Sequence, residues 1–267
     1  MSNKVTILGT RGSVPVSGPE FAKYGGATTC VVVTLAGQSV VLDAGTGILK
    51  LSTAVSPETE SLPLIITHSH VDHMLGLPMC PQAFNKDFRF DVYMKTRGGL
   101  GAKAQLETFL TLPIWPVGPD QLPAGFTFRD LPESFTLGSI KVTTMEGNHP
   151  GGVSMIRLDG DGKSVVFATD SVIDEALFPA FMEFAGSPDL LLIDGQYSQE
   201  EYNGHPNFGH NSWNEAARTG LKIGAKKTLV VHHNTTKTDG ELDALIPGLK
   251  AINPGCSPAF ESQEVIL

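Results

Sequence analysis

Residues 62–73 read LPLIITHSHVDH, a short apolar run followed at once by three histidines and one aspartate. His68 and His70 are two positions apart, so at the end of an extended segment their side chains point to the same side. Asp72 and His73 follow where the chain turns, and their side chains can face a second ion beside the first. Imidazole and carboxylate groups suit Zn(II), and also Mn(II) or Fe(II). The stretch therefore predicts a β-strand that runs into a metal-binding loop.

The other histidines of the chain follow the same pattern. Each lies close to a predicted strand end or in a loop rich in Gly and Pro, whereas scattered histidines would also occur inside ordinary helices and strands. They are His149, His205, His210, His232 and His233. Their distribution favours a shared site at the ends of strands.

A metal on His68 and His70 needs at least one more protein ligand. His149 is the best candidate, because it follows the predicted strand 140–145 and enters a turn that contains Pro and two Gly. A lone histidine before proline is more often an ordinary loop residue. The prediction for His149 therefore depends on the cluster at 68–73.

A second metal on Asp72 and His73 also needs completion. Two divalent ions about 3.5–4 Å apart repel strongly unless an anion lies between them. Asp170 follows an apolar strand and is predicted to be that bridging carboxylate, although an aspartate there could instead cap a helix. The remaining imidazole comes from His232 or His233, and His232 is favoured because it directly continues a strand.

The order of these ligands resembles the metallo-β-lactamase superfamily, and the resemblance spans almost the whole chain. The matching positions are His68, His70, Asp72, His73, His149, Asp170 and His232. Gly-rich segments also resemble the phosphodiesterase branch of that superfamily, which contains tRNA 3′-processing enzymes and cyclic-nucleotide diesterases. These segments are 9–13, 24–26 and 42–47. The resemblance implies an α/β (α+β) fold, a four-layer αββα sandwich with a dinuclear site at one edge of its two sheets, and a single hydrolase domain over residues 1–267.

The resemblance also implies roles beside the ligand set. It gives Asp43 the task of orienting metal ligands, and it gives catalytic roles to Asp72 and His210. His210 would serve the scissile phosphate, either as an acid toward the leaving oxygen or as a donor to a phosphoryl oxygen. A helix is predicted to begin after Ser212, and a helix N-terminus favours anions. The alternative is that His210 merely packs under Trp213.

Three neighbouring positions carry weaker expectations. Asn211 stands where the phosphodiesterase branch has a small hydroxyl residue, which leaves the set of phosphate donors open. His205 is expected to be a loop residue, and Asp194 is expected to stabilise a strand end.

The predicted chemistry is hydrolysis with two divalent ions, Zn(II) before Mn(II) or Fe(II). Two ions lower the pKa of a bridging water, so that hydroxide can attack a bound phosphodiester while His210 assists. The alternatives are a thioester or lactone hydrolase with the same ligands and a non-catalytic metal-binding sensor. Oxygen chemistry is disfavoured, because the flavodiiron branch would have Glu in place of His70.

A small phosphodiester such as a cyclic nucleotide is the predicted substrate. The tRNA-processing enzymes insert an arm where residues 151–169 leave room only for a hairpin, and the net charge of −9 disfavours a large nucleic-acid surface. Residues 109–117 resemble a substrate-side insertion of that branch, although Trp115 could simply be packed. The resemblance also implies a possible homodimer.

Composition predicts a cytoplasmic protein without a membrane segment. No stretch approaches the ~20 apolar residues that span a bilayer, and the N-terminal sequence MSNKVTILGT enters a strand without the apolar segment of a signal peptide. The 3 cysteines are odd in number and widely spaced, which argues against a disulfide framework.

The pattern of short apolar runs between turn residues predicts strands interspersed with helices, and hence sheets covered by helices. The expected strands are 5–8, 29–35, 39–42, 64–66, 90–93, 140–145, 153–158, 164–168, 190–193 and 228–231. The expected helices are 49–55, 100–110, 175–184, 213–223 and 241–249. Gly160-Asp161-Gly162 predicts a hairpin turn, Ser212 begins a capping-box pattern, and Pro247 is expected to end the last helix early.

Overall fold

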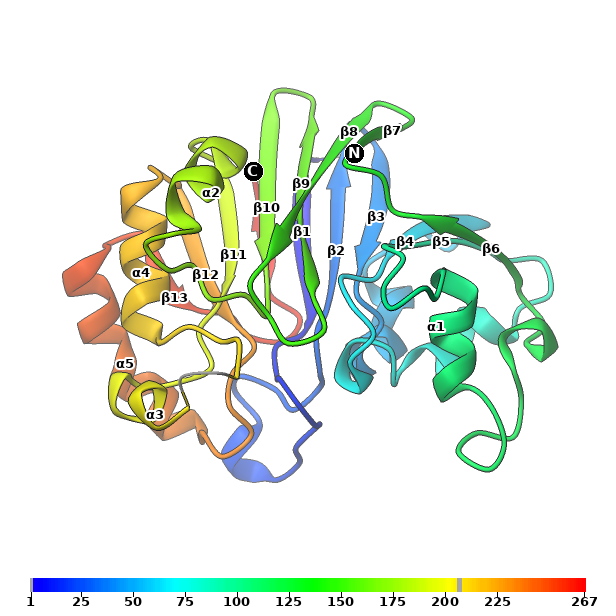
Figure 1. The fold of residues 1–267 in the computed structure, drawn as a ribbon, viewed down its shortest axis with the longest axis horizontal. Coiled ribbons are helices and arrows are strands. Elements are labelled where there is room, and N and C mark those ends of the chain that lie inside the picture. The colour runs from blue at the N-terminus through cyan, green and yellow to red at the C-terminus, as the bar shows by residue number, and fades with distance from the viewer. Residues whose placement is uncertain (1, 206–207) are drawn as a thin grey trace.

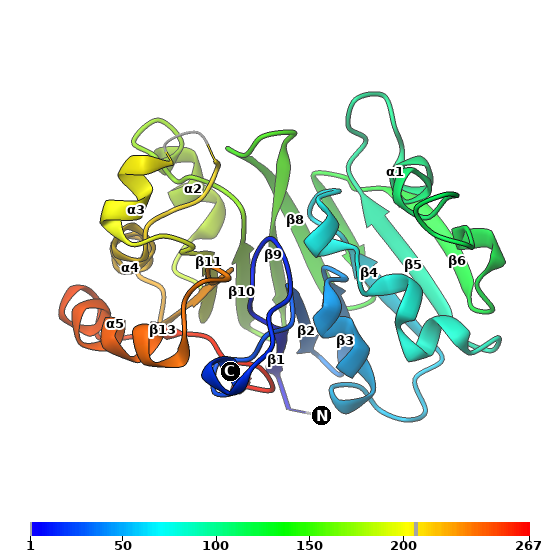
Figure 2. The ribbon, with the colours of Figure 1, turned by 90° about the horizontal axis from the view of Figure 1, so that it is seen from below.

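The computed structural model describes residues 2–205 and 208–267 of the chain. It consists of two seven-stranded sheets packed face to face, with helices on the outer face of each (Figure 1). Seen from below, α2, α3, α4 and α5 lie outside one sheet and α1 lies outside the other (Figure 2). The predicted four-layer αββα sandwich is therefore confirmed.

The first sheet has the order β14-β1-β2-β3-β4-β5-β6, antiparallel from β14 to β3 and parallel from β3 to β6. Its strands are β1 (Lys4–Gly9), β2 (Cys30–Leu35), β3 (Gln38–Leu42), β4 (Ser61–Ile65), β5 (Arg89–Met94), β6 (Gly125–Asp130) and β14 (Glu264–Ile266).

The second sheet has the order β13-β12-β11-β10-β9-β8-β7, parallel from β13 to β10 and antiparallel from β10 to β7. Its strands are β7 (Ser134–Leu137), β8 (Ile140–Gly147), β9 (Val153–Gly160), β10 (Lys163–Ala168), β11 (Leu190–Asp194), β12 (Lys227–Val231) and β13 (Cys256–Pro258).

Helices and 3₁₀ turns fill the connections. The α-helices are α1 (Ala102–Phe109), α2 (Phe178–Ala185), α3 (Gln199–Gly204), α4 (Trp213–Lys222) and α5 (Asp239–Ile252). The 3₁₀ segments are Pro19–Phe21, Thr46–Thr53, Val71–His73, Leu77–Met79, Pro81–Phe84 and Pro119–Gln121. None of the described helices is long and apolar enough to cross a membrane.

Strand β2 shows how the sequence produces the layers. Its side chains alternate, so that Cys30 and Val32 enter the core under the outer 3₁₀ segments and α1. Val31 and Val33 enter the core between the two sheets. A third core lies between the second sheet and α2, α4 and α5. Three separate apolar layers are what four stacked layers of secondary structure require.

The ten predicted strands are all present, with shifted ends, and the structure corrects three details of the helices. Residues 49–55 belong largely to the 3₁₀ segment Thr46–Thr53 rather than to an α-helix. Helix α2 begins at Phe178, after residue 175. Pro247 lies inside α5 and does not end it. The helix begins earlier than expected, at a capping box on Thr238, and continues to Ile252.

The predicted hairpin turn between β9 and β10 is confirmed. Gly160 pairs with Lys163, which leaves Asp161 and Gly162 as the two turn residues. Both have positive φ, 52° and 69°, as a type I′ turn requires. Ser212 does cap α4 by accepting the backbone N–H of Glu215, but the Glu215 side chain pairs with Arg218 instead of completing the box.

Two glycines with open space around them provide a test of this backbone analysis. A Cβ on Gly248, inside α5, or on Gly162, in the turn, would meet nothing within 4 Å. Gly248→Ala should stabilise the protein by about 0.5–1 kcal/mol, because alanine favours helix. Gly162→Ala should destabilise it by about 1 kcal/mol, because φ is +69° there. Urea unfolding of both variants measures the difference, and a shift of the same sign in both would contradict it.

Candidate metal and catalytic site

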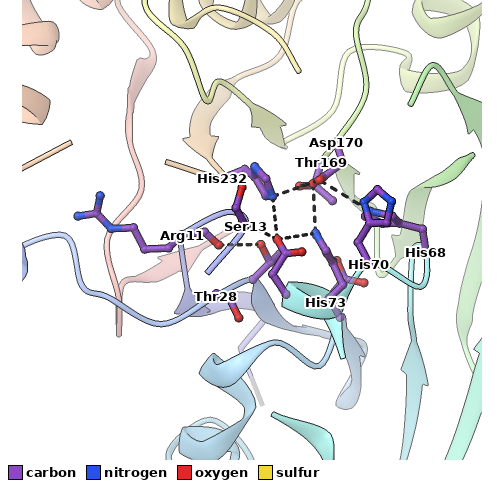
Figure 3. A network of polar contacts seen from close by, with 12 residues as sticks. Arg11, Ser13, Thr28, His68, His70, His73, Thr169, Asp170 and His232 are labelled. Atoms are coloured by element: carbon purple, nitrogen blue, oxygen red, sulfur yellow. Dashed lines mark hydrogen bonds and ion pairs between the residues drawn. The ribbon is translucent and has the colours of Figure 1, made fainter. Parts of the chain in front are cut away.

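The histidine loop lies directly after β4, at the rim of the sandwich. The strand ends at Ile65, and the 3₁₀ turn Val71–His73 then reverses the chain. His68 and His73 are buried, whereas His70 is exposed. Figure 3 shows the three imidazoles directed toward Asp170 and His232, which come from the second sheet. The predicted gathering of distant residues at strand ends is therefore what the structure shows.

His68, His70 and His149 form the first of three groups of potential metal ligands in the described chain; the third, Asp170, Asp194, His210 and His232, shares two members with the second. One ring nitrogen from each lies within 4.8 Å of the others. His149 Nε2 lies 3.0 Å from His70 Nδ1, and the rings of His68 and His70 are 4.4 Å apart between centroids. His149 enters from the turn after β8, where the sequence placed it.

Asp72, His73, Asp170 and His232 form the second group, also within 4.8 Å. Asp72 Oδ2 lies 3.3 Å from His73 Nε2 and 3.2 Å from His232 Nε2. All four residues are buried. The group combines two imidazoles and two carboxylates at the junction of the two sheets.

Asp170 lies between the two groups. Its Oδ2 is 3.8 Å from Nε2 of both His68 and His149 in the first group. It is also 3.1 Å from Nε2 of His232 in the second. Helix α2 begins only at Phe178, so the alternative role of Asp170 as a helix cap does not apply.

His232 and His233 point in different directions. His232 Nε2 faces Asp72 and Asp170. His233 Nε2 donates to the backbone carbonyl of Ala259 at 2.9 Å, away from the cluster. Burial lowers the pKa of His233 to about 3, so it is a neutral core residue. The geometry favours His232, as the sequence did.

Asp43 contacts the second group on the Nδ1 side of the His73 ring. His73 Nδ1 donates to Asp43 Oδ2 at 2.7 Å, which directs Nε2 of the same ring toward Asp72 and Asp170. The backbone N–H of Thr67 donates to the other carboxylate oxygen at 2.7 Å. The position agrees with the predicted orienting role of Asp43.

Asp194 has a contact that the sequence did not reveal. It ends β11 as expected, but its Oδ2 also accepts from His210 Nδ1 at 2.6 Å. The His210 ring lies 5.1 Å from that of His149 and 4.9 Å from that of His232, so it faces both groups. The aspartate fixes which nitrogen of His210 faces the cluster, and the alternative of packing under Trp213 does not describe this geometry.

Asn211 has a structural task. Its side chain is buried, accepts the backbone N–H of Ile173 at 3.0 Å and donates to the carbonyl of Ser171. Its own N–H donates to Asp194 at 3.0 Å. Asn211 therefore joins the loop after Asp170 to the start of α4, and its side chain is not free to bind phosphate. His205, which ends α3 and stacks on Tyr197, is not part of either group.

Backbone strain gathers at this rim. Asp43, Asp170 and His232 have φ values of 61°, 52° and 61°, which residues other than glycine seldom adopt. A Cβ on Gly12 would lie 2.2 Å from the ring of His232, so only glycine fits there. Such conformations persist where the surrounding structure imposes them, and they concentrate at functional sites.

The imidazoles of the first group are neutral at pH 7. Burial, with a contribution from His73, lowers the pKa of His68 well below its usual value. Partial burial of its ring also lowers the pKa of His70, and burial lowers that of His149 to about 4. Neutral imidazole is the form that coordinates metals.

The second group has the opposite electrostatics. Burial disfavours a charge on His232, but Asp170 and Asp72 outweigh it and raise its pKa to about 10. Burial likewise disfavours a charge on His73, yet Asp72, Asp170 and Asp43 raise its pKa well above the usual value. The two carboxylates therefore require positive charge, supplied either by protons on the imidazoles or by a bound cation.

Both groups fit divalent metal ions. Within the described chain, Nε2 of His68 is buried and has no hydrogen-bond partner, and Nε2 of His73 lies 3.3 Å from Asp72 and 3.4 Å from Asp170 without hydrogen-bond geometry to either. Buried polar atoms without partners are rare and costly, and coordination to a cation would satisfy both. Imidazole with carboxylate is a donor set that suits zinc and related metals.

Comparison with known proteins agrees with this site. A family profile described as "Beta-lactamase superfamily domain" matches residues 38–233, so the chain belongs to that family. Membership of this family confirms the prediction of a metal-dependent hydrolase. A protein named Ribonuclease Z from Bacillus velezensis is 23% identical in an alignment that covers 80% of this chain and 83% of that protein. A probable metallo-hydrolase from Bacillus subtilis, YhfI, is 23% identical over 86% of each chain.

Solved structures show the same fold. The structure of YhfI from Bacillus subtilis has a TM-score of 0.73 at 21% identity and covers 98% of both chains. A diphosphatase of the PhnP family has a TM-score of 0.72 at 18% identity, covering 100% of this chain and 98% of its own.

Asp43→Asn tests the support behind His73. The amide can donate as well as accept, and it carries no charge, so it should hold the His73 ring less firmly. We expect metal affinity to fall about 10–100-fold while the fold is retained. Competition with a chelating dye measures the affinity, and Asp91→Asn, whose partly exposed side chain on β5 pairs with Arg129, is the matched control. Equal affinities in wild type and Asp43→Asn would contradict the orienting role.

Metal binding should weaken as the pH falls. The raised pKa values of His73 and His232 mean that both are protonated near pH 7 before a metal binds. Binding must displace those protons, so lower pH favours the metal-free form. Calorimetric titration with Zn(II) in buffers of different ionisation enthalpy measures the released protons. A metal affinity independent of pH between about 6 and 8, with no proton release, would contradict this electrostatic account.

Proposed function

We propose that the protein is a dinuclear metal-dependent phosphodiesterase that acts on a small phosphodiester such as a cyclic nucleotide. The observation that carries the proposal is the position of His210. It is held by Asp194 beside both metal-binding groups and two residues before the cap of α4. A helix N-terminus favours an anion, and a phosphodiester is an anion.

The proposed ligands follow the two groups. His68, His70 and His149 would hold one ion, and Asp72, His73 and His232 the other, with Asp170 shared between them. Zn(II) is the first choice, and Mn(II) or Fe(II) are alternatives. When bound, a pair of such ions supplies Lewis-acid activation of water and of the phosphoryl group.

The residues of the chain itself would position the substrate and move the proton. Because Asp194 accepts from Nδ1 of His210, only Nε2 of that ring can face a bound phosphodiester. A proton on Nε2 would be donated to a phosphoryl oxygen or to the leaving oxygen. Asp72 would orient the reacting group through its contacts with His73 and His232. Charge that builds up during attack would thus meet a prepared donor.

Two features support a small substrate. Residues 153–168 form the plain hairpin β9–β10, with no protruding arm in this segment. The net charge is −9, which opposes a broad nucleic-acid surface. Trp115 packs on Phe109, with ring centroids 6.0 Å apart, and the neighbouring Leu112 is exposed. A substrate-side role for residues 109–117 stays a prediction.

The cytoplasmic location and a homodimer are kept as proposals. The location is supported by Cys30, Cys80 and Cys256, which are buried and free of disulfides. The dimer is supported by the resemblance alone.

The test is a panel of cyclic nucleotides, linear dinucleotides, thioesters, lactones and bis(p-nitrophenyl) phosphate, with Zn(II) or Mn(II). We expect turnover of phosphodiesters and loss of at least 1000-fold in Asp170→Ala, because removal of the shared carboxylate leaves the cations unscreened. His210→Ala should lower kcat for phosphodiesters about 100-fold or more. Turnover of acyl substrates alone, unaffected by His210→Ala, would reject the phosphodiesterase proposal in favour of a thioester or lactone hydrolase.

A further inference from the structure

Ser13 lies at the rim of the site and contacts a proposed ligand without being one. Its backbone N–H donates to Asp72 Oδ2 at 2.8 Å. Its hydroxyl oxygen is three covalent bonds from that nitrogen, so it also lies beside the second group. Figure 3 shows Ser13 next to His232, and the residue is exposed, unlike the buried ligands around it.

The backbone holds Ser13 in a strained position. Val14 N–H donates to the Gly12 carbonyl at 2.7 Å across Ser13, whose φ is 63°. A three-residue turn with positive φ is rare and costly. Gly12 is packed against the His232 ring and its N–H donates to the His233 carbonyl at 3.1 Å, so the turn is fixed on both sides.

Gln196 determines which way the Ser13 hydroxyl proton points. Gln196 is only 6% exposed, and its Nε2 donates to Ser13 Oγ at 3.3 Å. Since Oγ accepts from Gln196, its own proton must point elsewhere, and the open side of an exposed residue is available. Gln196 Oε1 is buried and has no partner in the described chain, so within that chain the bond to Ser13 is the hydrogen bond that the Gln196 side chain makes.

We propose that the Ser13 hydroxyl, oriented by Gln196, donates a hydrogen bond to a phosphoryl oxygen of the substrate at the second group. Ser13 is thus a substrate-binding residue, and Gln196 is a positioning residue that acts through it. The inference rests on the proposed phosphodiesterase function. The ligand chemistry it requires is a tetrahedral phosphoryl anion with an oxygen free to accept.

The first test measures binding of inorganic phosphate to the metal-loaded full chain by calorimetry. Ser13→Ala and Ser13→Gly both remove the hydroxyl and keep the N–H that donates to Asp72. They differ in backbone strain, which glycine relieves at φ +63°. We expect both to bind phosphate about tenfold more weakly and to raise KM for bis(p-nitrophenyl) phosphate, with unchanged metal content. Ser139→Ala, at an exposed turn before β8, should behave as wild type.

The second test is a double-mutant cycle with Gln196→Met, which keeps the length of the side chain and removes its amide. Alone it should weaken phosphate binding, because the Ser13 hydroxyl is no longer oriented. Combined with Ser13→Ala it should add nothing, because it acts through that hydroxyl. Additive losses would overturn the positioning role of Gln196.

The outcomes separate this inference from the function on which it rests. Phosphodiester turnover by the wild type, with phosphate affinity unchanged in both Ser13 variants, overturns the role of Ser13 alone. Phosphate binding that weakens in those variants, without turnover of any phosphodiester, supports Ser13 and rejects the function. A metal-loaded wild type that does not bind phosphate overturns the role of Ser13, whereas the function is overturned only if no phosphodiester is turned over.

Discussion

Two buried carboxylates that require neighbouring positive charge are the centre on which the rest of this structure depends. Asp72 and Asp170 are almost fully buried at the junction of the two sheets. Burial raises the pKa of each, yet the neighbouring imidazoles outweigh it and keep both carboxylates ionised. Buried charges of this kind are stable only when they are paired. The histidines around them, and the residues that orient those histidines, satisfy that requirement.

The sandwich is what makes this pairing possible. Parallel strands bring their carboxyl ends to one edge of a sheet, and facing two such sheets brings two edges together. Asp170 follows β10 and His232 follows β12, while His73 follows β4 of the opposite sheet. Residues more than 150 positions apart, such as Asp72 and His232, thus come within 3.2 Å. Asp43 and Asp194 perform the same task on either side, each holding one imidazole by its Nδ1.

The sequence predicted the ligand groups because their signals are local. An apolar run that stops at a histidine or aspartate identifies a strand end, and strand ends were enough to place His149, Asp170 and His232. The strands that were missed, β6, β7, β13 and β14, are short or partly exposed, so their apolar alternation is weak. The prediction for Pro247 was wrong because the rule that proline ends a helix considers only the local sequence. Tertiary packing of Leu242 and Leu249 maintains α5 past the proline.

The contacts of Asp194 and Gln196 could not be predicted from the sequence. Both lie in an ordinary strand end, LLLIDGQ, and nothing local indicates that one meets His210 and the other Ser13. Their partners are 16 and 183 positions away. The same holds for Asn211, which looked like a replaced phosphate donor and turns out to join two loops. Such hydrogen bonds form only once the fold has brought the strand ends together at the rim, so the local sequence does not indicate them.

The candidate metal ligands come from both sheets, and this affects the stability of the contact between the two halves. His68, His70, Asp72 and His73 belong to one half of the sandwich, and His149, Asp170 and His232 to the other. A cation shared by these groups would link the two halves at this rim, whereas elsewhere the sheets are joined by the apolar core between them and by ion pairs such as that of Arg97 with Glu146. Binding of that cation would add its binding free energy to the free energy needed to separate the two halves. Removal of the cation would therefore weaken the contact between the two halves at this rim.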